Sequence, residues 1–268
     1  MRFKDRVVWI TGASAGIGEG LATAFAGEGA RLVLSARRVD QLERVKAGCP
    51  GTAEVLLVPF DMIDDIGRAR AVETVLRHYG RIDIMVHNAG VTQRSLAKDT
   101  AMPVDRAIME LDYFSVIALT KLVLPSMLAR KSGHFVVTSS VAGKFGTPLR
   151  SAYCAAKHAL HGYFDTLMVE CAADNIAVSL LVVAGVKTDI SLHALRGDGS
   201  LWGKMDDTQS KGMPVADCAR IVLDGVAKKK HEINVLVPPT DRYIFLRRFL
   251  PSYFYRMLIK RMSALVAK

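Results

Sequence analysis

The segment RVVWITGASAGIG, residues 6–18, decides the fold of this chain. It opens with a run of apolar, mostly β-branched residues over 6–11, passes through a glycine-rich turn and enters a segment of helical period over 17–28. An apolar strand that turns through glycines directly into a helix is the opening unit of a doubly wound α/β sheet. The segment therefore predicts a first strand, a tight turn and a crossover helix.

The glycines of this turn have separate roles. Gly12 permits the tight turn, Gly16 lets the backbone approach a pyrophosphate, and Gly18 lets the helix pack closely on the strand. The helix N-terminus offers free N–H groups to an anion. The residues predicted to bind a dinucleotide here are Gly12, Ser14, Ala15, Gly16, Ile17 and Gly18. The glycines alone leave an ordinary strand-to-helix turn open as the alternative.

The same alternation continues along the chain. Near-continuous apolar runs, typical of strands buried on both faces, occur at 31–36, 54–60, 82–88, 133–140, 176–183 and 233–237. Segments with the length and period of helices occupy 39–48, 64–79, 103–131, 151–173 and 214–229. The 268 residues, half of them hydrophobic, are predicted to form one α/β domain. Its core is a Rossmann-type doubly wound parallel β-sheet of about seven strands with helices on both faces.

Two segments depart from this alternation. Residues 188–213 are rich in polar and turn-forming residues and follow the sixth strand, at the sheet edge where ligands bind. We expect them to form a mobile substrate lid, with a surface loop of no function as the alternative. Residues 1–240 are then the catalytic domain, which includes the lid, and residues 241–268 are a C-terminal extension.

The extension holds most of the excess positive charge. The net charge of the chain is +10, and residues 241–268 contain seven Lys or Arg and one Asp, a net of +6 that leaves +4 for residues 1–240. Six aromatic residues lie among these charges. This mixture suits a helix at a lipid interface or a hydrophobic surface shared with another subunit, and both interpretations remain open.

Several classes of partner and site are not expected. The chain has no basic stripe interleaved with aromatic residues before the extension, so nucleic acid is not a predicted partner. The four cysteines lack disulfide or metal-ligand spacing, so they are predicted to be reduced and buried, and no metal site is expected. The apolar run after Arg6 is too short for a signal peptide or a membrane span. We expect a cytoplasmic protein, at most peripheral at a membrane surface.

Arg37 and Arg38 follow the second predicted strand, where cofactor choice is decided. An NAD enzyme places Asp or Glu there to bind the ribose hydroxyls, and that acid repels a 2′-phosphate. Arginine attracts a phosphate and binds it in bidentate fashion. The pair therefore favours NADP(H) over NAD(H), with a solvated start of the next helix as the alternative.

Tyr153 and Lys157 lie four positions apart in a predicted helix, and Ser140 ends the fifth predicted strand. Residues four apart share a helix face, so the ammonium can stabilise the phenolate. An unperturbed phenol has a pKa near ~10, too high for a base at neutral pH without a nearby cation. Ser140 can hydrogen-bond a substrate oxygen. His87 is predicted to be a satisfied core histidine.

The chain resembles the short-chain dehydrogenase/reductase family over roughly residues 5–240. The matching pieces are TGASAGIG at 11–18, Asp61, Asn88-Ala89-Gly90, Ser139-Ser140, Tyr153-Cys154-Ala155-Ala156-Lys157, and Gly185 with Thr188. The resemblance implies that Asp61 and Met62 hold the adenine, that Asn88, Ala89 and Gly90 flank the cofactor, and that Val186 and Thr188 meet the nicotinamide amide. It also implies that Lys157 binds the nicotinamide ribose and that the chain forms dimers or tetramers.

Asp112 stands where the family usually has Asn, whose backbone carbonyl helps to hold a water near the lysine. A carboxylate at this position is expected to raise the pKa of Lys157 and to alter proton flow. Ala184-Gly185 replaces the usual Pro-Gly, a change that loosens the turn.

The predicted function is hydride transfer between NADP(H) and a carbonyl or secondary alcohol. VTQRSLAKDT, YCAAKHALHGYF and LRGDGSLWGKM resemble membrane-associated relatives that act on steroid, retinoid or other lipophilic carbonyls. Two alternatives are a dinucleotide-sensing binding protein that has lost catalysis and a peripheral membrane scaffold.

Overall fold

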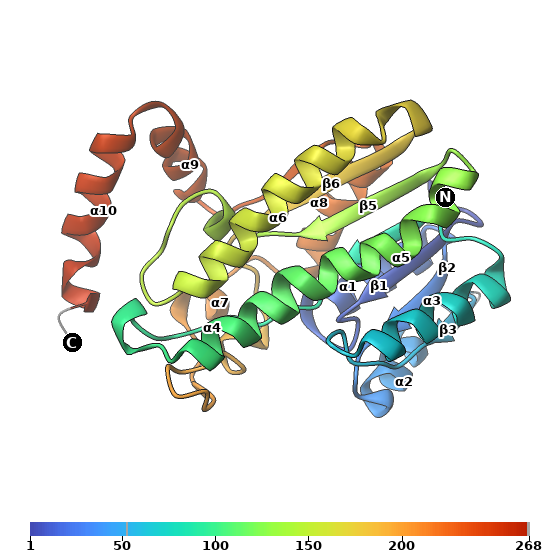
Figure 1. Cartoon of the computed structure of the whole chain (residues 1–268), viewed down its shortest axis with the longest axis horizontal. Coiled ribbons are helices and arrows are strands. Elements are labelled where there is room, and N and C mark those ends of the chain that lie inside the picture. The colour runs from blue at the N-terminus through green and yellow to red at the C-terminus, as the bar shows by residue number, and fades with distance from the viewer. Residues whose placement is uncertain (52, 267–268) are drawn as a thin grey trace.

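Seven parallel strands form one continuous sheet in the order β3-β2-β1-β4-β5-β6-β7 (Figure 1). The structure is a computed structural model that describes residues 1–51 and 53–266. The strands are β1 (Val7–Thr11), β2 (Arg31–Ser35), β3 (Val55–Leu57), β4 (Ile84–His87), β5 (Gly133–Thr138), β6 (Ile176–Val183) and β7 (Glu232–Val235). Each predicted apolar run overlaps one of these strands, and β7 begins one residue before its run, so the predicted sheet is confirmed.

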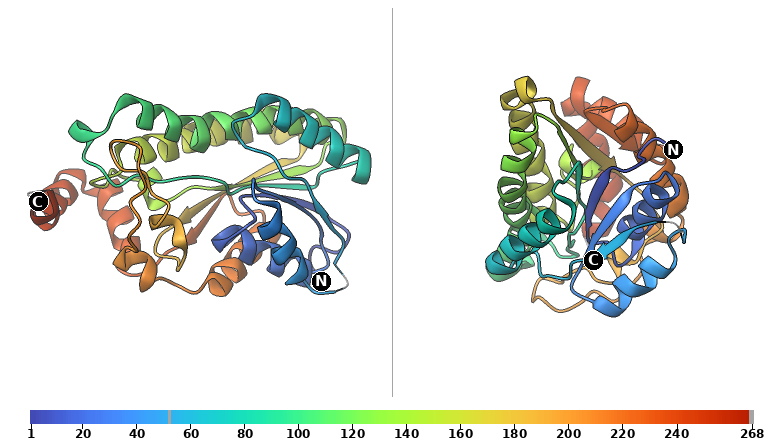
Figure 2. Two further views of the ribbon diagram at one scale, coloured as in Figure 1. Left: turned by 90° about the horizontal axis from the view of Figure 1, so that it is seen from below. Right: turned by 90° about the vertical axis from the view of Figure 1, so that its right-hand side faces the viewer.

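Helices cover both faces of the sheet, as Figure 2 shows in its left view. One face holds α1 (Gly16–Gly27), α2 (Val39–Ala47) and α8 (Val215–Ala227), and the other holds α3 (Asp65–Tyr79), α5 (Ser115–Ala129) and α6 (Ser151–Glu170). Alternate residues of β1 show the reason, because Val8 and Ile10 enter one buried cluster while Val7 and Trp9 enter the other. Burial on both faces explains why the strands read as unbroken apolar runs.

The predicted helix over 103–131 is wrong in one respect, because it is interrupted. It consists of α4 (Met102–Met109), a π-helical turn η2 (Glu110–Phe114) and α5. The π-helical turn contains Asp112, whose side chain is fully buried. Such single-turn π segments inside α-helices are frequent at functional sites.

The shorter elements lie in the connections between these layers. They are the 3-10 turns η1 (Ala97–Asp99), η3 (Val141–Gly143), η4 (Ala172–Asp174) and η5 (Asp189–Ser191), and the one-turn helix α7 (Asp207–Ser210). The insertion over 188–213 contains η5 and α7 and is bridged to the rest of the chain at Leu195.

The last two helices, α9 (Thr240–Phe249) and α10 (Pro251–Val266), form a hairpin at one end of the molecule (Figure 1). It docks through Phe254, which is fully buried and lies 5.1 Å from Phe145 between ring centroids. Over the described ranges 1–51 and 53–266, no helix has both the length and the apolar character needed to cross a bilayer.

The chain changes direction across the sheet at β1, which pairs with β2 on one side and with β4 on the other. In an open α/β sheet such a switch point leaves a crevice at the carboxyl ends of the strands. The ends of β1, β4, β5 and β6 therefore converge on one site.

Candidate active site

The glycine turn between β1 and α1 is packed so closely that side chains are excluded. Gly12 and Gly16 have φ of 63° and 57°, the left-handed region that favours glycine. A Cβ on Gly12 would lie 2.8 Å from Ala89 Cα, and one on Gly18 would lie 2.2 Å from the Gly12 carbonyl oxygen. Ala15, the N-cap of α1, provides no side-chain hydrogen bond within the described structure. The bare turn and the uncapped helix N-terminus fit a dinucleotide pyrophosphate.

Thr11, which was not predicted, ties this turn to the end of β4. Its hydroxyl oxygen accepts hydrogen bonds from the backbone N–H groups of Asn88 (3.1 Å) and Ala89 (3.3 Å). Asn88 Nδ2 donates to the Gly12 carbonyl at 3.2 Å, and Thr138 Oγ1 donates to Asn88 Oδ1 at 3.3 Å. Thr11 opens the family-matching piece TGASAGIG, whereas Thr138 had only its position at a strand end as a signal.

Val186 and Thr188 lie beside the same turn. A Cβ on Gly16 would lie 3.1 Å from Thr188 Cγ2, so the segment after β6 approaches the start of α1. Val186 is buried and bridges to Met213 at the far end of the insertion. The structure thus brings the segments at 12–18, 88–90 and 186–188 together.

Arg37, Arg38, Asp61 and Met62 lie at the carboxyl ends of β2 and β3. Arg37 is 78 % exposed and its Nη1 lies 3.8 Å from Asp61 Oδ2. Arg38 is an exposed N-cap of α2, whereas Met62 is buried. Both arginines are therefore exposed to solvent, and Arg37 faces the Asp61 carboxylate.

Lys157 lies under Tyr153, with its Nζ 5.5 Å from the centroid of the phenol ring. Lys157 is buried and Tyr153 is half-buried. The ammonium donates a hydrogen bond to the Thr138 carbonyl at 3.1 Å, which anchors it to the end of β5. Ser140 follows two residues later, and its Oγ accepts from the Ala142 N–H at 3.1 Å, so its own hydroxyl proton is free to be donated.

Asp112 faces the same lysine with its side chain, whereas the family pattern uses the backbone carbonyl at this position. Its Oδ2 lies 3.1 Å from Lys157 Nζ and its Oδ1 accepts from the Val91 N–H at 2.7 Å. The Oδ2 contact is an ion pair in poor hydrogen-bond alignment, because this oxygen has no aligned donor in the described part of the chain.

The charges of this buried pair depend on one another. Burial raises the pKa of Asp112, against the opposing attraction of Lys157 and the Val91 N–H. Burial alone lowers the pKa of Lys157, but the attraction of Asp112 and Tyr153 outweighs it and the net direction is upward. This upward direction is the one that a neighbouring carboxylate produces, and the effect of Asp112 on proton flow stays a prediction.

The histidines lie outside this cluster. His161 Nε2 is 3.0 Å from Ser139 Oγ, and burial lowers the pKa of His161 to about 4, which fits a structural role. His158 is exposed and bonds the Cys154 carbonyl of its own helix. The prediction for His87 is only half right: Nε2 bonds Thr120 Oγ1 at 2.9 Å, but Nδ1 has no partner among the described residues.

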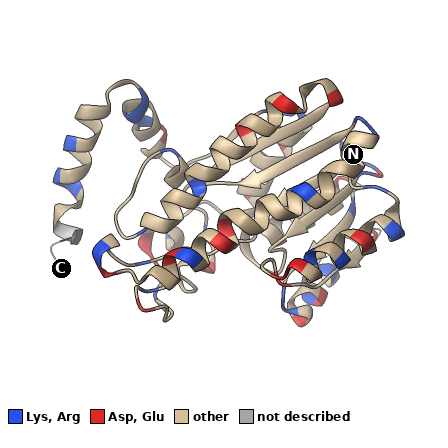
Figure 3. Cartoon of the chain, viewed as in Figure 1, with Lys and Arg blue, Asp and Glu red and all other residues tan. Residues whose placement is uncertain are grey.

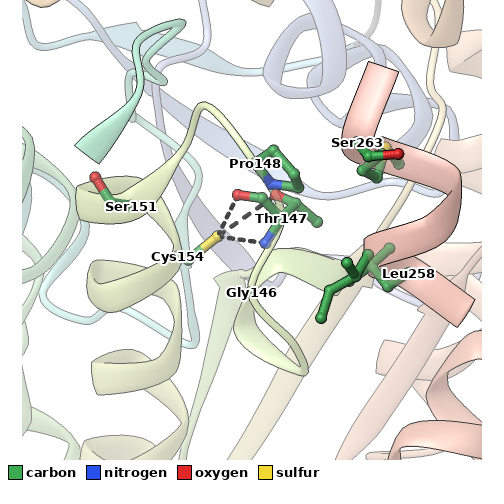
Figure 4. Close-up of a pocket in the computed structure, with 9 residues that line it drawn as sticks. Gly146, Thr147, Pro148, Ser151, Cys154, Leu258 and Ser263 are labelled. Atoms are coloured by element: carbon green, nitrogen blue, oxygen red, sulfur yellow. Dashed lines mark hydrogen bonds between the residues drawn. The ribbon is translucent and has the colours of Figure 1, made fainter. Parts of the chain in front are cut away.

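A cavity of about 750 Å³ lies between α10 and the connection from β5 to α6 (Figure 4). Cys154 Sγ accepts from the Thr147 N–H at 3.4 Å and holds this connection against α6. The lining residues are Gly146, Thr147, Pro148, Ser151, Cys154, Leu258, Ile259, Met262 and Ser263. The wall is thus largely apolar and includes the first turn of the helix that carries Tyr153.

Known proteins share both the sequence and this architecture. An Anopheles gambiae dehydrogenase/reductase SDR family protein 7-like is 42% identical over 268 residues, which cover 97% of this chain and 84% of that protein. The mouse dehydrogenase/reductase SDR family member 7B is 37% identical over 263 residues, 96% of this chain and 81% of the relative.

Solved structures repeat the fold. A short-chain dehydrogenase from Streptomyces avermitilis superimposes with a TM-score of 0.80 at 26% identity, over 100% of this chain and 99% of its own. A Burkholderia phymatum short chain dehydrogenase/reductase in complex with NAD has a TM-score of 0.78 at 22% identity, over 92% and 94%. A metagenomic short-chain oxidoreductase in complex with NADP has a TM-score of 0.72 at 26% identity, over 88% and 98%. Residues 6–197 also match the short chain dehydrogenase family as a whole, and this chain is a member of that family.

Proposed function

We propose that this oxidoreductase uses NADP(H) to interconvert a carbonyl and a secondary alcohol on a lipophilic substrate. The observation that carries the proposal is the buried ammonium of Lys157 under the phenol ring of Tyr153, 5.5 Å from its centroid. A cation in this position stabilises the phenolate that a proton shuttle needs. Membership of the family supports the reaction type, and the arginines support the choice of cofactor.

The protein groups divide the proton chemistry among them. In reduction, Tyr153 donates its phenolic proton to the substrate oxygen as that oxygen gains negative charge, and the Ser140 hydroxyl donates a hydrogen bond to the same atom. Lys157 stabilises the phenolate that remains. Oxidation uses the same groups in reverse. The nicotinamide, when bound, supplies or accepts the hydride.

The cofactor would be held by three parts of the chain. The turn at 12–18 and the N-terminus of α1 would bind the pyrophosphate. Asp61 and Met62 would hold the adenine. The exposed guanidinium groups of Arg37 and Arg38 suit a 2′-phosphate, which favours NADP(H). Residues 88–90 would flank the cofactor, Val186 with Thr188 would meet the nicotinamide amide, and Lys157 would bind the ribose. We assign the catalytic unit to residues 1–240 and a substrate lid to residues 188–213.

A carbonyl panel from small ketones to steroids, followed by NADPH oxidation, tests the reaction and the size of the pocket. We expect turnover with the larger apolar ketones. Tyr153→Phe should abolish turnover and leave NADPH affinity largely intact, because it removes only the phenolic oxygen. Tyr163→Phe, which changes a half-buried tyrosine of the same helix, is the matched control. Turnover by Tyr153→Phe equal to that of the control would refute the assignment.

We further propose that the hairpin of α9 and α10 lies on an anionic lipid surface. Phe245, Phe249, Leu250 and Tyr253 are each more than half exposed, and Lys and Arg line both helices (Figure 3). Aromatic and basic residues together suit a lipid interface. A symmetric subunit interface through the same face would bring two basic hairpins together, so we place the homodimer or homotetramer contact elsewhere.

Sedimentation with liposomes tests this surface. Vesicles that contain anionic phospholipid should carry the wild-type chain down, and vesicles of neutral phospholipid should carry less. Phe245→Ser combined with Phe249→Ser should weaken binding, and the exposed Leu201→Ser in the insertion is the control. Unchanged sedimentation, or a change of oligomeric state in the double variant, would favour a subunit interface instead.

A further inference from the structure

The helix that carries Tyr153 and Lys157 begins without a cap of its own. The N-cap of α6 is Arg150, and its side chain makes no capping hydrogen bond within residues 1–51 and 53–266. The first N–H groups of an α-helix have no partner inside the helix, and leaving them buried and unbonded is costly. Tyr153 is the third residue of α6, so its own N–H is one of these groups.

Gln93, from a distant part of the chain, bonds two of these groups. Its Oε1 accepts hydrogen bonds from the backbone N–H groups of Ala152 (2.9 Å) and Tyr153 (3.3 Å). Its Nε2 donates to Thr100 Oγ1 at 3.2 Å and to Ser151 Oγ at 3.3 Å. A reversed amide would point two donors at two N–H groups, so this network determines the orientation of the side chain. Gln93 is fully buried, which protects these bonds from water.

The backbone around Gln93 is fastened to the insertion over 188–213. Gln93 bridges to Leu195, with the Arg94 N–H donating to the Leu195 carbonyl at 2.8 Å and the Leu195 N–H donating to the Thr92 carbonyl at 2.8 Å. Gln93 therefore touches both the first turn of α6 and the segment that we assign to the lid.

A buried ion pair at the next residue, Arg94, also joins the segment after β4 to the insertion over 188–213. Arg94 is 4 % exposed in its side chain and pairs with Asp206 of the insertion. Arg150 Nη2 lies 3.3 Å from the same Asp206 Oδ2. The insertion, the segment after β4 and the first turn of α6 are thus joined by one carboxylate and one amide.

We propose that Gln93 is the positioning residue for Tyr153. This inference rests on the proposed function, because it assumes that the phenol of Tyr153 is the proton donor. By holding the Tyr153 N–H, the amide determines where the ring stands relative to Lys157 and Ser140. Its loss frays the first turn of α6 and displaces the phenol, and a displacement of about 1 Å costs about a hundredfold in rate.

Three variants test the proposal. Gln93→Leu keeps the volume and removes every hydrogen bond, and we expect kcat to fall by about a hundredfold with the KM for NADPH unchanged. Gln93→Glu keeps the acceptor at a helix N-terminus that favours negative charge, so it should recover most of the lost kcat. Thr100→Val removes one Nε2 partner and leaves the three bonds to α6, and it should resemble the wild type. If Gln93→Leu fails to fold, Gln93→Ala admits water to the freed N–H groups and replaces it.

A second measurement is the pH dependence of kcat/KM for alcohol oxidation, which a displaced phenol changes and a loss of folded protein does not. The profile of Gln93→Leu should be displaced from that of the wild type. An unchanged profile together with an unchanged kcat would overturn the positioning role, as would a Gln93→Glu variant as impaired as Gln93→Leu. If Tyr153→Phe alone retains full turnover, the proposed function fails instead, and the two failures are distinguished.

Discussion

Asp112 Oδ2 lies 3.1 Å from Lys157 Nζ, and both side chains are buried. The π-helical turn η2 aims this carboxylate at the lysine, and its other oxygen is held by the Val91 N–H. The positive charge under the Tyr153 ring is therefore shared with an anion. The negative charge of Asp112 partly cancels the positive potential that the ammonium creates at the phenol. Asp112 therefore weakens the effect of Lys157 on the tyrosine.

Asp112→Asn tests this sharing. Loss of the carboxylate lets burial dominate and lowers the pKa of Lys157, while the cation that remains at neutral pH acts on Tyr153 without compensation. We expect the rate of alcohol oxidation to reach half its maximum at a pH lower by on the order of one unit. The measurement is the pH dependence of kcat/KM with NADP+ and a secondary alcohol.

Glu110→Gln is the matched control, because it neutralises an exposed carboxylate in the same π-helical turn. Its pH profile should coincide with that of the wild type. Identical profiles for the wild type and Asp112→Asn would show that the carboxylate does not influence the proton relay.

Arg37→Ala combined with Arg38→Ala should weaken NADPH binding by about tenfold or more, with little effect on NADH. Only NADPH carries the 2′-phosphate that two exposed guanidinium groups can bind. Calorimetric titration of both cofactors measures the difference. Arg70→Ala, on the exposed surface of α3, is the control, and equal losses for the two cofactors would contradict the phosphate role.

The glycine turn and the pair of Tyr153 and Lys157 were predictable because their information is local. Gly12 and Gly18 have no room for a side chain, so the residue type itself reports the close approach of α1 to β1 and β4. Residues 153 and 157 share a helix face wherever a helix forms. The alternation of apolar runs sets the order of strands and helices in the same way.

Gln93 and the π-helical turn were not predictable, because their roles depend on distant partners. Gln93 lies 60 positions from Tyr153 in the sequence. The residues next to Gln93 in the sequence do not indicate that its amide contacts a helix N-terminus. The turn that contains Asp112 lies inside the single helical segment predicted over 103–131, with helix on both sides of it. Contacts of this kind follow from the tertiary fold and have no signature in a sequence window.

His87 should make the protein less stable in acid. Its ring packs beside both Phe135 and Phe164, and burial lowers its pKa from 6.5 to about 3. Below pH 6.5 a proton binds His87 in the unfolded chain but not in the folded chain. The free energy of unfolding therefore falls as the pH drops from 6.5 toward 3. The contribution is about 1.4 kcal/mol per pH unit in this window.

His87→Phe removes this titration and the unbonded Nδ1, and Thr120 keeps its bond to the Val116 carbonyl. Between about pH 7 and about pH 5, the free energy of unfolding in urea should fall by about 2 kcal/mol less in the variant than in the wild type. His134 and His161, whose pKa values burial also lowers to about 4, contribute equally to both proteins. His193→Phe, which changes an exposed histidine, should retain the wild-type slope. If His87→Phe also retained the wild-type slope, the folded protein would have to accept a proton on the His87 imidazole beside two phenylalanine rings. That result would contradict the claim that burial keeps His87 neutral.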